Sequence, residues 1–251
     1  MHHDHIEALH AVRDLGLRLK PDDVAAVDVS VHPPFTDLRT VQTLIEGEQL
    51  PISLGAQHCS DHERGPFTGE VSPQMLARLG VRYVLVGHSE RRRLFGMTDE
   101  QVASTLRAVL AHPMVPVCCV GESEEERDAG ETEARLASQL AAALEGLPAD
   151  RVAGLVIAYE PLWAIGTGRA ATPEDAQDAC AHVRAVVEGI AGSAAAEVVV
   201  QYGGSVTPDN AGDLVAQPDV DGLLVGGASL EAPSFTAVIR AVGACYRSPA
   251  R

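Results

Sequence analysis

A glutamate and a histidine stand where two apolar runs of the chain end. Glu160 closes the run VAGLVIAYE at 152–160, and His88 directly follows the run VRYVLVG at 81–87. A carboxylate placed against apolar walls can have a raised proton affinity, which suits a general base. A glutamate at a strand end is more often simply solvated, so Glu160 alone is a weak signal.

His88 is followed by Ser89 and Glu90. If Ser89 caps a short helix, the positive end of that helix lies beside the imidazole. This position would disfavour the imidazolium form and keep His88 neutral. A neutral imidazole can donate a hydrogen bond to a substrate oxygen. From these residues alone, a histidine packed in a loop is an equally good interpretation.

Two glycine pairs follow the last two apolar runs. Gly203 and Gly204 precede Ser205, and Gly226 and Gly227 end the final run. Glycine lets backbone N–H groups approach an anion closely. Such turns after the last two strands are the usual phosphate site of barrel enzymes. We therefore prefer a phosphate site to the alternative of two ordinary tight turns.

The only tryptophan of the chain, Trp163, lies in a segment rich in glycine and proline. Pro161 stiffens the start of this segment, and Gly166 and Gly168 free its far end. A stiff tip between hinge-like ends describes a lid. A lone indole would give the tip an apolar body that docks over the site and excludes water. The predicted lid comprises Pro161, Leu162, Trp163, Ala164, Ile165, Gly166, Thr167 and Gly168.

Seven short apolar runs must position these groups, and they alternate with longer segments of helical pattern. Most runs are β-branched and apolar on both faces, as buried parallel strands are. N-cap residues followed by proline, as at Ser72-Pro73, mark helix starts. This alternation is typical of an α/β protein with a parallel sheet. The expected strands lie at 24–31, 52–57, 81–87, 115–121, 152–160, 197–204 and 220–227.

We expect a (β/α)₈ TIM barrel, with a doubly wound sheet as the alternative. Candidate ligand groups end several runs, and a barrel gathers such groups from many strand ends, whereas an open sheet gathers them at one switch point. No linker divides the chain, so residues 1–251 predict a single domain. The first element, 4–19, is helical, so the first β-strand of the barrel is missing. The strands at 24–31 and 220–227 would then keep open edges.

Composition excludes several classes of protein. The 251 residues carry a formal net charge of −16, the opposite sign to that of a nucleic-acid or acidic-membrane binder. The five cysteines form no C-x-x-C pair, which indicates free thiols in a reducing compartment. No apolar run is long enough to span a membrane, and no signal peptide opens the chain. These features predict a soluble, cytoplasmic protein.

The motifs that contain these groups resemble those of the triosephosphate isomerase family. The match covers nearly the whole chain, in family order. It implies a (β/α)₈ barrel that interconverts dihydroxyacetone phosphate and glyceraldehyde 3-phosphate, in glycolysis and gluconeogenesis, without a metal or organic cofactor. The matching stretches are 33-PPFTDL-38, 55-GAQ-57, 65-GPFTGEVS-72, 86-VGHSERR-92, 119-CVGE-122, 158-AYEPLWAIGTG-168, 202-YGGSV-206 and 220-VDGLLVGGASL-230.

The resemblance also implies roles for single residues. Glu160 would abstract the proton alpha to the carbonyl, and His88 would act as the neutral electrophile that stabilises the enediolate. This pairing is well described for the family and is not a deduction from these residues. Glu90 would belong to the catalytic group, and Thr68 would be the tip of a loop that reaches into a partner subunit, which implies a homodimer. The phosphate would be bound, largely through backbone N–H groups, by Gly166, Ser205, Gly226 and Gly227.

The sequence departs from the family pattern at its front. The first strand of the family reads like N-W-K-M-N and supplies an asparagine and a lysine to the active site. Met1 aligns best with the methionine inside that motif, so both positions are absent. The single lysine, Lys20, stands where a turn at the opposite face of the barrel is expected, and Glu90 would lose its partner. Removing one preorganised electrostatic group typically costs about 10²–10³ in turnover.

Three interpretations remain open. In the first, the start is an internal methionine of a longer, ordinary enzyme. In the second, the chain is a shortened, catalytically impaired paralogue that acts as a phosphate-binding or interaction protein. We prefer the first, because the other motifs are intact. A different phosphate-binding barrel isomerase, such as one from amino-acid biosynthesis, is disfavoured by the combination of GHSERR and YEPLWAIGTG.

Overall fold

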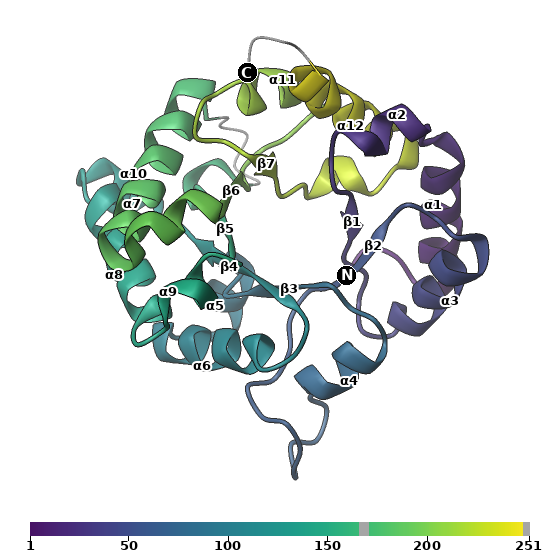
Figure 1. The fold of residues 1–251 in the computed structure, drawn as a ribbon, viewed down its shortest axis with the longest axis horizontal. Helices are drawn as coiled ribbons and strands as arrows, with labels where there is room; N and C mark the ends of the chain where they lie inside the picture. Colours follow the sequence, from purple (N-terminus) through teal and green to yellow (C-terminus); the bar gives the residue numbers. More distant parts are fainter. Residues whose placement is uncertain (166–170, 248–251) are drawn as a thin grey trace.

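A computed structural model, which describes residues 1–165 and 171–247, has a parallel sheet inside an outer ring of helices (Figure 1). The sheet has seven strands in the order β1 to β7, so each strand pairs with the next along the chain. Parallel neighbours require a crossover connection, which the helices supply. The strands are β1 (Ser30–Val31), β2 (Ser53–Ala56), β3 (Tyr83–Val86), β4 (Val115–Val120), β5 (Val156–Tyr159), β6 (Val199–Tyr202) and β7 (Gly222–Leu223).

Helices connect all consecutive strands and also precede β1. The first helix begins at the capping box of Asp4, whose side chain accepts the amides of Ile6 and Glu7. The helical elements are α1 (His5–Arg18), α2 (Pro21–Ala25), α3 (Leu38–Glu48), α4 (Pro73–Arg78), α5 (Ser89–Phe95), α6 (Asp99–Leu110), α7 (Glu124–Asp128), α8 (Thr132–Leu144), α9 (Ala149–Val152), η1 (Leu162–Ala164), α10 (Pro173–Ala191), η2 (Gly192–Glu197), α11 (Ala211–Val215), η3 (Gly227–Ser229) and α12 (Ala232–Arg247).

The parallel α/β architecture is confirmed, and each of the seven expected runs contains a strand. All seven strands are shorter than the predicted runs, and three of the runs begin with helical residues. The run 24–31 begins inside α2, because Pro21 fits the first helical turn and Asp23 accepts the amide of Lys20. The run 152–160 likewise begins at the last residue of α9, and the run 197–204 begins at the last residue of η2.

Two apolar layers lie on the two faces of the sheet. The larger packs the outer face against the helices and includes Val86, Cys118 and Ile157. The smaller fills the inner face and consists of Leu85, Val117, Cys119, Val156 and Ala158. Alternate residues of β4 and β5 therefore enter different layers, as strand geometry requires.

The sheet ends at β1 and β7. Within the described residues β1 pairs with β2 and β7 pairs with β6, and no pairing joins β7 to β1. The two open edges expected from the sequence are thus observed. Val199, paired with the inner-layer residue Val156, is 38% exposed, so the inner face is open to water near this gap.

Candidate active site

Glu160 directly follows β5, and its backbone is fixed by the strands on both sides. Its amide donates to the carbonyl oxygen of Val120 at 2.7 Å, and the carbonyl of the preceding Tyr159 accepts the amide of Gly203 at 2.7 Å. The residue is only 2% exposed. Its carboxylate is therefore held at the carboxyl ends of β4, β5 and β6, the face where barrel enzymes carry their sites.

Three donors converge on this carboxylate. The amide of Ser89 donates to Oε2 at 2.9 Å, and the Ser89 hydroxyl donates to Oε1 at 3.2 Å. Nε2 of His88 lies 3.0 Å from Oε1. The structure thus brings together the glutamate and the histidine that the sequence singled out, although 71 residues separate Ser89 from Glu160.

Burial raises the pKa of the Glu160 carboxyl above its usual value. His88 and the hydrogen bonds from Ser89 oppose this effect by stabilising the carboxylate. Because burial is the larger influence, the group has a higher proton affinity than a solvated glutamate. Such a carboxylate is suited to accept a proton near neutral pH.

The hydrogen bonds of His88 define its tautomer. Its Nδ1 accepts the amide of Glu90 at 3.3 Å, so in this arrangement the ring proton is on Nε2, which faces Glu160. The cap differs from the expectation: His88 itself is the N-cap of α5, and Ser89 is the first helical residue. The side chain of Ser89 instead turns to Glu160. The imidazole still lies at the positive end of the helix, as predicted.

Glu90 lies at the rim of this group. Its side chain is 65% exposed, and Oε2 is 3.9 Å from Nδ1 of His88. Lys20, the only lysine, is exposed between α1 and α2, on the side of the sheet where β1 begins. It therefore lies at the face opposite the carboxyl ends of the strands, as the sequence indicated.

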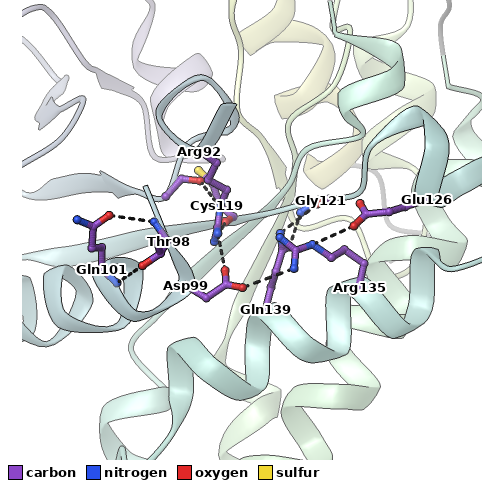
Figure 2. Close-up of polar contacts among 10 residues, drawn as sticks. Arg92, Thr98, Asp99, Gln101, Cys119, Gly121, Glu126, Arg135 and Gln139 are labelled. Carbon is purple, nitrogen blue, oxygen red and sulfur yellow. Dashed lines mark hydrogen bonds and ion pairs between the residues drawn. The ribbon is translucent and has the colours of Figure 1, made fainter. Parts of the chain in front are cut away.

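Arg92 braces the strand ends beneath His88. Its Nε donates to the carbonyl of Gly87 at 2.8 Å and its Nη2 to the carbonyl of Cys119 at 3.3 Å, and Nη1 pairs with Asp99 at 2.5 Å (Figure 2). The guanidinium thus joins the ends of β3 and β4. Since His88 follows Gly87, these bonds fix the main chain from which the imidazole extends.

The glycine pairs serve two different purposes. A Cβ on Gly204 would lie 2.1 Å from the Tyr202 hydroxyl and 2.9 Å from Cγ of Pro161, so close packing requires this glycine. Gly226 and Gly227 are exposed, and a Cβ on either would meet nothing within 4 Å. Open space beside backbone amides at the start of η3 is suited to an anion.

Ser205 and Gly166, the other two predicted phosphate ligands, are placed differently. The Ser205 hydroxyl donates to the carbonyl of Ala164 in the predicted lid at 3.1 Å. This bond joins the turn after β6 to the segment after β5. Gly166 lies outside the described residues, together with Thr167 and Gly168 of the predicted lid.

Trp163 is buried in this structure as an anchor for the start of the predicted lid, whereas the sequence predicted an indole at the lid tip that docks over the site. It is 4% exposed, and its Nε1 donates to Oε1 of Glu122 at 2.8 Å. The Tyr159 hydroxyl donates to the same oxygen at 3.0 Å, and the guanidinium of Arg127 lies 4.1 Å from the indole centroid. The indole therefore holds the start of the predicted lid against the loop after β4. This role explains why the only tryptophan lies in a segment rich in glycine and proline.

The sequence reasoning missed Glu122 as a functional residue. It is fully buried, and burial raises the pKa of its carboxyl. Its carbonyl also accepts the amide of Leu162 at 3.1 Å. The available signal resembled that of Glu160, since Glu122 directly follows the apolar run at 115–121.

Comparison with known proteins agrees with this geometry. The family model described as triosephosphate isomerase matches residues 1–242. The chain belongs to the triosephosphate isomerase family. The triosephosphate isomerase of Cutibacterium acnes is 48% identical over 242 residues, covering 95% of this chain and 93% of that protein. The triosephosphate isomerase of Saccharopolyspora erythraea is 51% identical over 237 residues, covering 94% and 91%.

A solved structure of a triosephosphate isomerase has the same fold. The crystal structure of the enzyme from Bartonella henselae superposes with a TM-score of 0.85 at 31% identity, covering 96% of this chain and 95% of that one. The TIM-barrel class predicted from the sequence is therefore confirmed, with the seven strands described above. None of the described helices is both long and apolar enough to cross a membrane.

Proposed function

We propose that the chain is a triose-phosphate isomerase, which interconverts dihydroxyacetone phosphate and D-glyceraldehyde 3-phosphate. The observation that carries this proposal is the 3.0 Å approach of His88 Nε2 to Oε1 of the buried Glu160. A base of raised proton affinity beside an N–H donor matches a proton shift next to a carbonyl. The membership of the chain in the family supports the same reaction and substrate.

In the proposed reaction Glu160 removes the proton from the carbon next to the carbonyl. The electrons of that C–H bond form the C=C bond of the enediolate, and the carbonyl oxygen becomes an oxyanion. Nε2–H of His88, now hydrogen-bonded to Glu160, would donate to this oxygen instead. His88 would give its Nε2 proton to this oxyanion and take the hydroxyl proton from the oxygen on the first carbon. As that oxygen becomes the new carbonyl, Glu160 returns a proton to the former carbonyl carbon, so the reaction balances without a cofactor.

The phosphate of the substrate would be bound by Gly166, Ser205, Gly226 and Gly227. The open space beside Gly226 and Gly227 supports this assignment. Residues 161–168 would close over the bound substrate. The bonds that hold Trp163 to Glu122 would keep the start of this lid in place while its remainder moves.

A homodimer would form through the loop that contains Thr68. Residues 61–70 are all exposed, and Phe67 beside Thr68 stacks on His62 at a centroid distance of 4.0 Å. On α5, Leu94 is 63% and Phe95 69% exposed. Large exposed apolar side chains of this kind support a protein interface.

We also propose that residues 1–251 form a single domain and that the protein is cytoplasmic. Its five cysteines are all free, which agrees with a reducing compartment. No observation favours the alternative of an impaired paralogue that only binds phosphate or a partner.

The test is a coupled isomerase assay in both directions, made on the chain as given and on a version that carries an added N-W-K strand before Met1. The added strand would pair with the free edges of β1 and β7 and supply the missing lysine. We expect turnover by both, with the added strand raising it by about 10²–10³. Activity on a phosphoribosyl substrate alone, or none with either version, would refute the proposal.

A further inference from the structure

Gln139 of α8 makes an unusual pair of hydrogen bonds with one residue. Its Oε1 accepts the amide of Gly121 at 2.8 Å, and its Nε2 donates to the carbonyl of the same Gly121 at 3.2 Å (Figure 2). The glutamine is 1% exposed. A buried carboxamide with both of its functional groups paired to one backbone unit is a fixed clamp, because breaking it would leave buried polar groups unpaired.

Gly121 is the residue on which the backbone of Glu160 rests. A Cβ on Gly121 would lie 1.8 Å from the carbonyl oxygen of Glu160, so the two main chains touch. The residues on both sides of Gly121 also bind this segment. Val120 accepts the amide of Glu160 at 2.7 Å, and Glu122 accepts the amide of Leu162 at 3.1 Å.

The strand ladder does not hold Gly121 itself. The strand β4 ends at Val120 and its neighbour β5 ends at Tyr159, so Gly121 lies one residue beyond the paired segment. Glycine is also the residue with the greatest backbone freedom. The carboxamide of Gln139 supplies, from a helix, the two hydrogen bonds that another strand would have supplied.

The helix that carries Gln139 is itself fixed at this point. Leu136 and Leu140 on either side are fully buried. One turn before Gln139, Arg135 pairs with Glu126 at 3.4 Å and with Asp99 at 3.5 Å (Figure 2). The clamp thus fastens the end of β4 to a rigid helix of the outer ring.

We propose that Gln139 is a positioning residue for Glu160 in the isomerase reaction. It acts through Gly121 and holds the main chain of the base, and the first turn of the lid, in the position from which Glu160 reaches the substrate carbon beside His88. The inference rests on the proposed function. A displacement of about 1 Å at a reacting group can cost on the order of 10² in rate.

The test compares Gln139→Met with the control Leu144→Ala on the same helix. Methionine fills a similar volume without the carboxamide, whereas Leu144 is equally buried, at 1% exposure, five residues further along α8. Gln139→Asn, which retains the carboxamide on a shorter side chain, is the second variant in case Gln139→Met does not fold. The readouts are kcat, KM, Tm and amide hydrogen exchange.

We expect Gln139→Met to lower kcat by about 10–10²-fold with KM within about twofold of the wild type. Amide exchange should accelerate at Gly121, Glu160 and Leu162, which all depend on the clamp. Leu144→Ala should lower Tm and leave kcat within about twofold. If Gln139→Met or Gln139→Asn lowers Tm and leaves kcat unchanged, as in the control, the inference is wrong.

The exchange measurement separates this inference from the proposed function. If the wild-type chain has no isomerase activity, the proposed function fails. The exchange rate of the Glu160 amide then still tests whether Gln139 holds the backbone of Glu160. Faster exchange at that amide in the Gln139 variant, with unchanged exchange in the core of β3, would still support the clamp. Unchanged exchange at Glu160 would overturn it.

Discussion

His88 and Glu160 follow different strands, β3 and β5, yet Nε2 and Oε1 of these residues are 3.0 Å apart across the end of β4. The pair is therefore carried by the central strands, which have the longest ladders in the sheet. The open edges at β1 and β7 are elsewhere in the sheet. This arrangement explains how the acid–base pair is formed while the sheet is open on its other side.

Glu160→Gln should make the folded protein more stable at pH 8 than the wild type. Burial raises the pKa of the Glu160 carboxyl in the folded state above its value in the unfolded chain. The contribution of this group to the free energy of unfolding is therefore full below the unfolded pKa and is lost as pH rises through the folded pKa. A neutral isostere avoids this loss. Urea unfolding at pH 4 and pH 8 would measure it. Equal free energies of unfolding at pH 8 would contradict the assignment.

Gly203→Ala should slow catalysis by crowding the base. Its Cβ would lie 3.1 Å from Cγ of Glu160, so the carboxylate would have to shift by a few tenths of an ångström. We expect kcat to fall several-fold with little change in Tm. Gly222→Ala is the matched control, since its Cβ would make an ordinary contact of 3.5 Å with Gln201. Similar steady-state rates for the two variants would show that Glu160 is not sensitive to this contact.

The sequence predicted the strands well because each buried strand is a short apolar run. It failed at the three run starts that are helical. The run 24–31 begins inside α2, where Asp23 caps the helix, and the runs 152–160 and 197–204 begin at the last residues of α9 and η2. The open edges at β1 and β7 were also foreseen, from a count of elements and not from any local pattern.

The candidate site was only partly predictable. Glu160 and His88 could be found because reactive residues after strands converge in a barrel. The contacts of Ser89, Glu122 and Gln139 could not, since they depend on which side chains meet across distant segments. The indole of Trp163 was expected to dock over the site from the tip of the lid, but the buried carboxylate of Glu122 provides it with a partner in the interior.

Trp163→Phe should loosen the start of the lid. The change removes the 2.8 Å bond to Glu122 and leaves a buried carboxylate with fewer donors. We expect the free energy of unfolding to fall by about 1–3 kcal/mol. Chemical denaturation followed by circular dichroism measures it, because the variant has no tryptophan to report fluorescence. A loss below about 0.5 kcal/mol, within the range of ordinary surface changes, would show that the anchor is unimportant.

Thr68→Arg should convert a dimer into monomers. The wild-type chain of 26.4 kDa is expected to sediment at twice that mass. A large cation at the exposed tip of the loop would be unable to enter the partner subunit without a matching charge. Sedimentation equilibrium measures both masses, with Thr43→Arg on the exposed face of α3 as the control. A monomeric wild type would refute the dimer.

The central claim, that Glu160 carries the proton between the two carbons, is tested most directly by isomerisation in D₂O followed by ¹H NMR. A carboxyl proton exchanges with solvent, so the account predicts deuterium at the reacting carbons of substrate and product. Glu160→Gln should lower both isomerisation and exchange by about 10²–10⁴. A Glu160→Gln variant that isomerises at the wild-type rate, or a wild-type product formed without any deuterium at these carbons, would contradict the account.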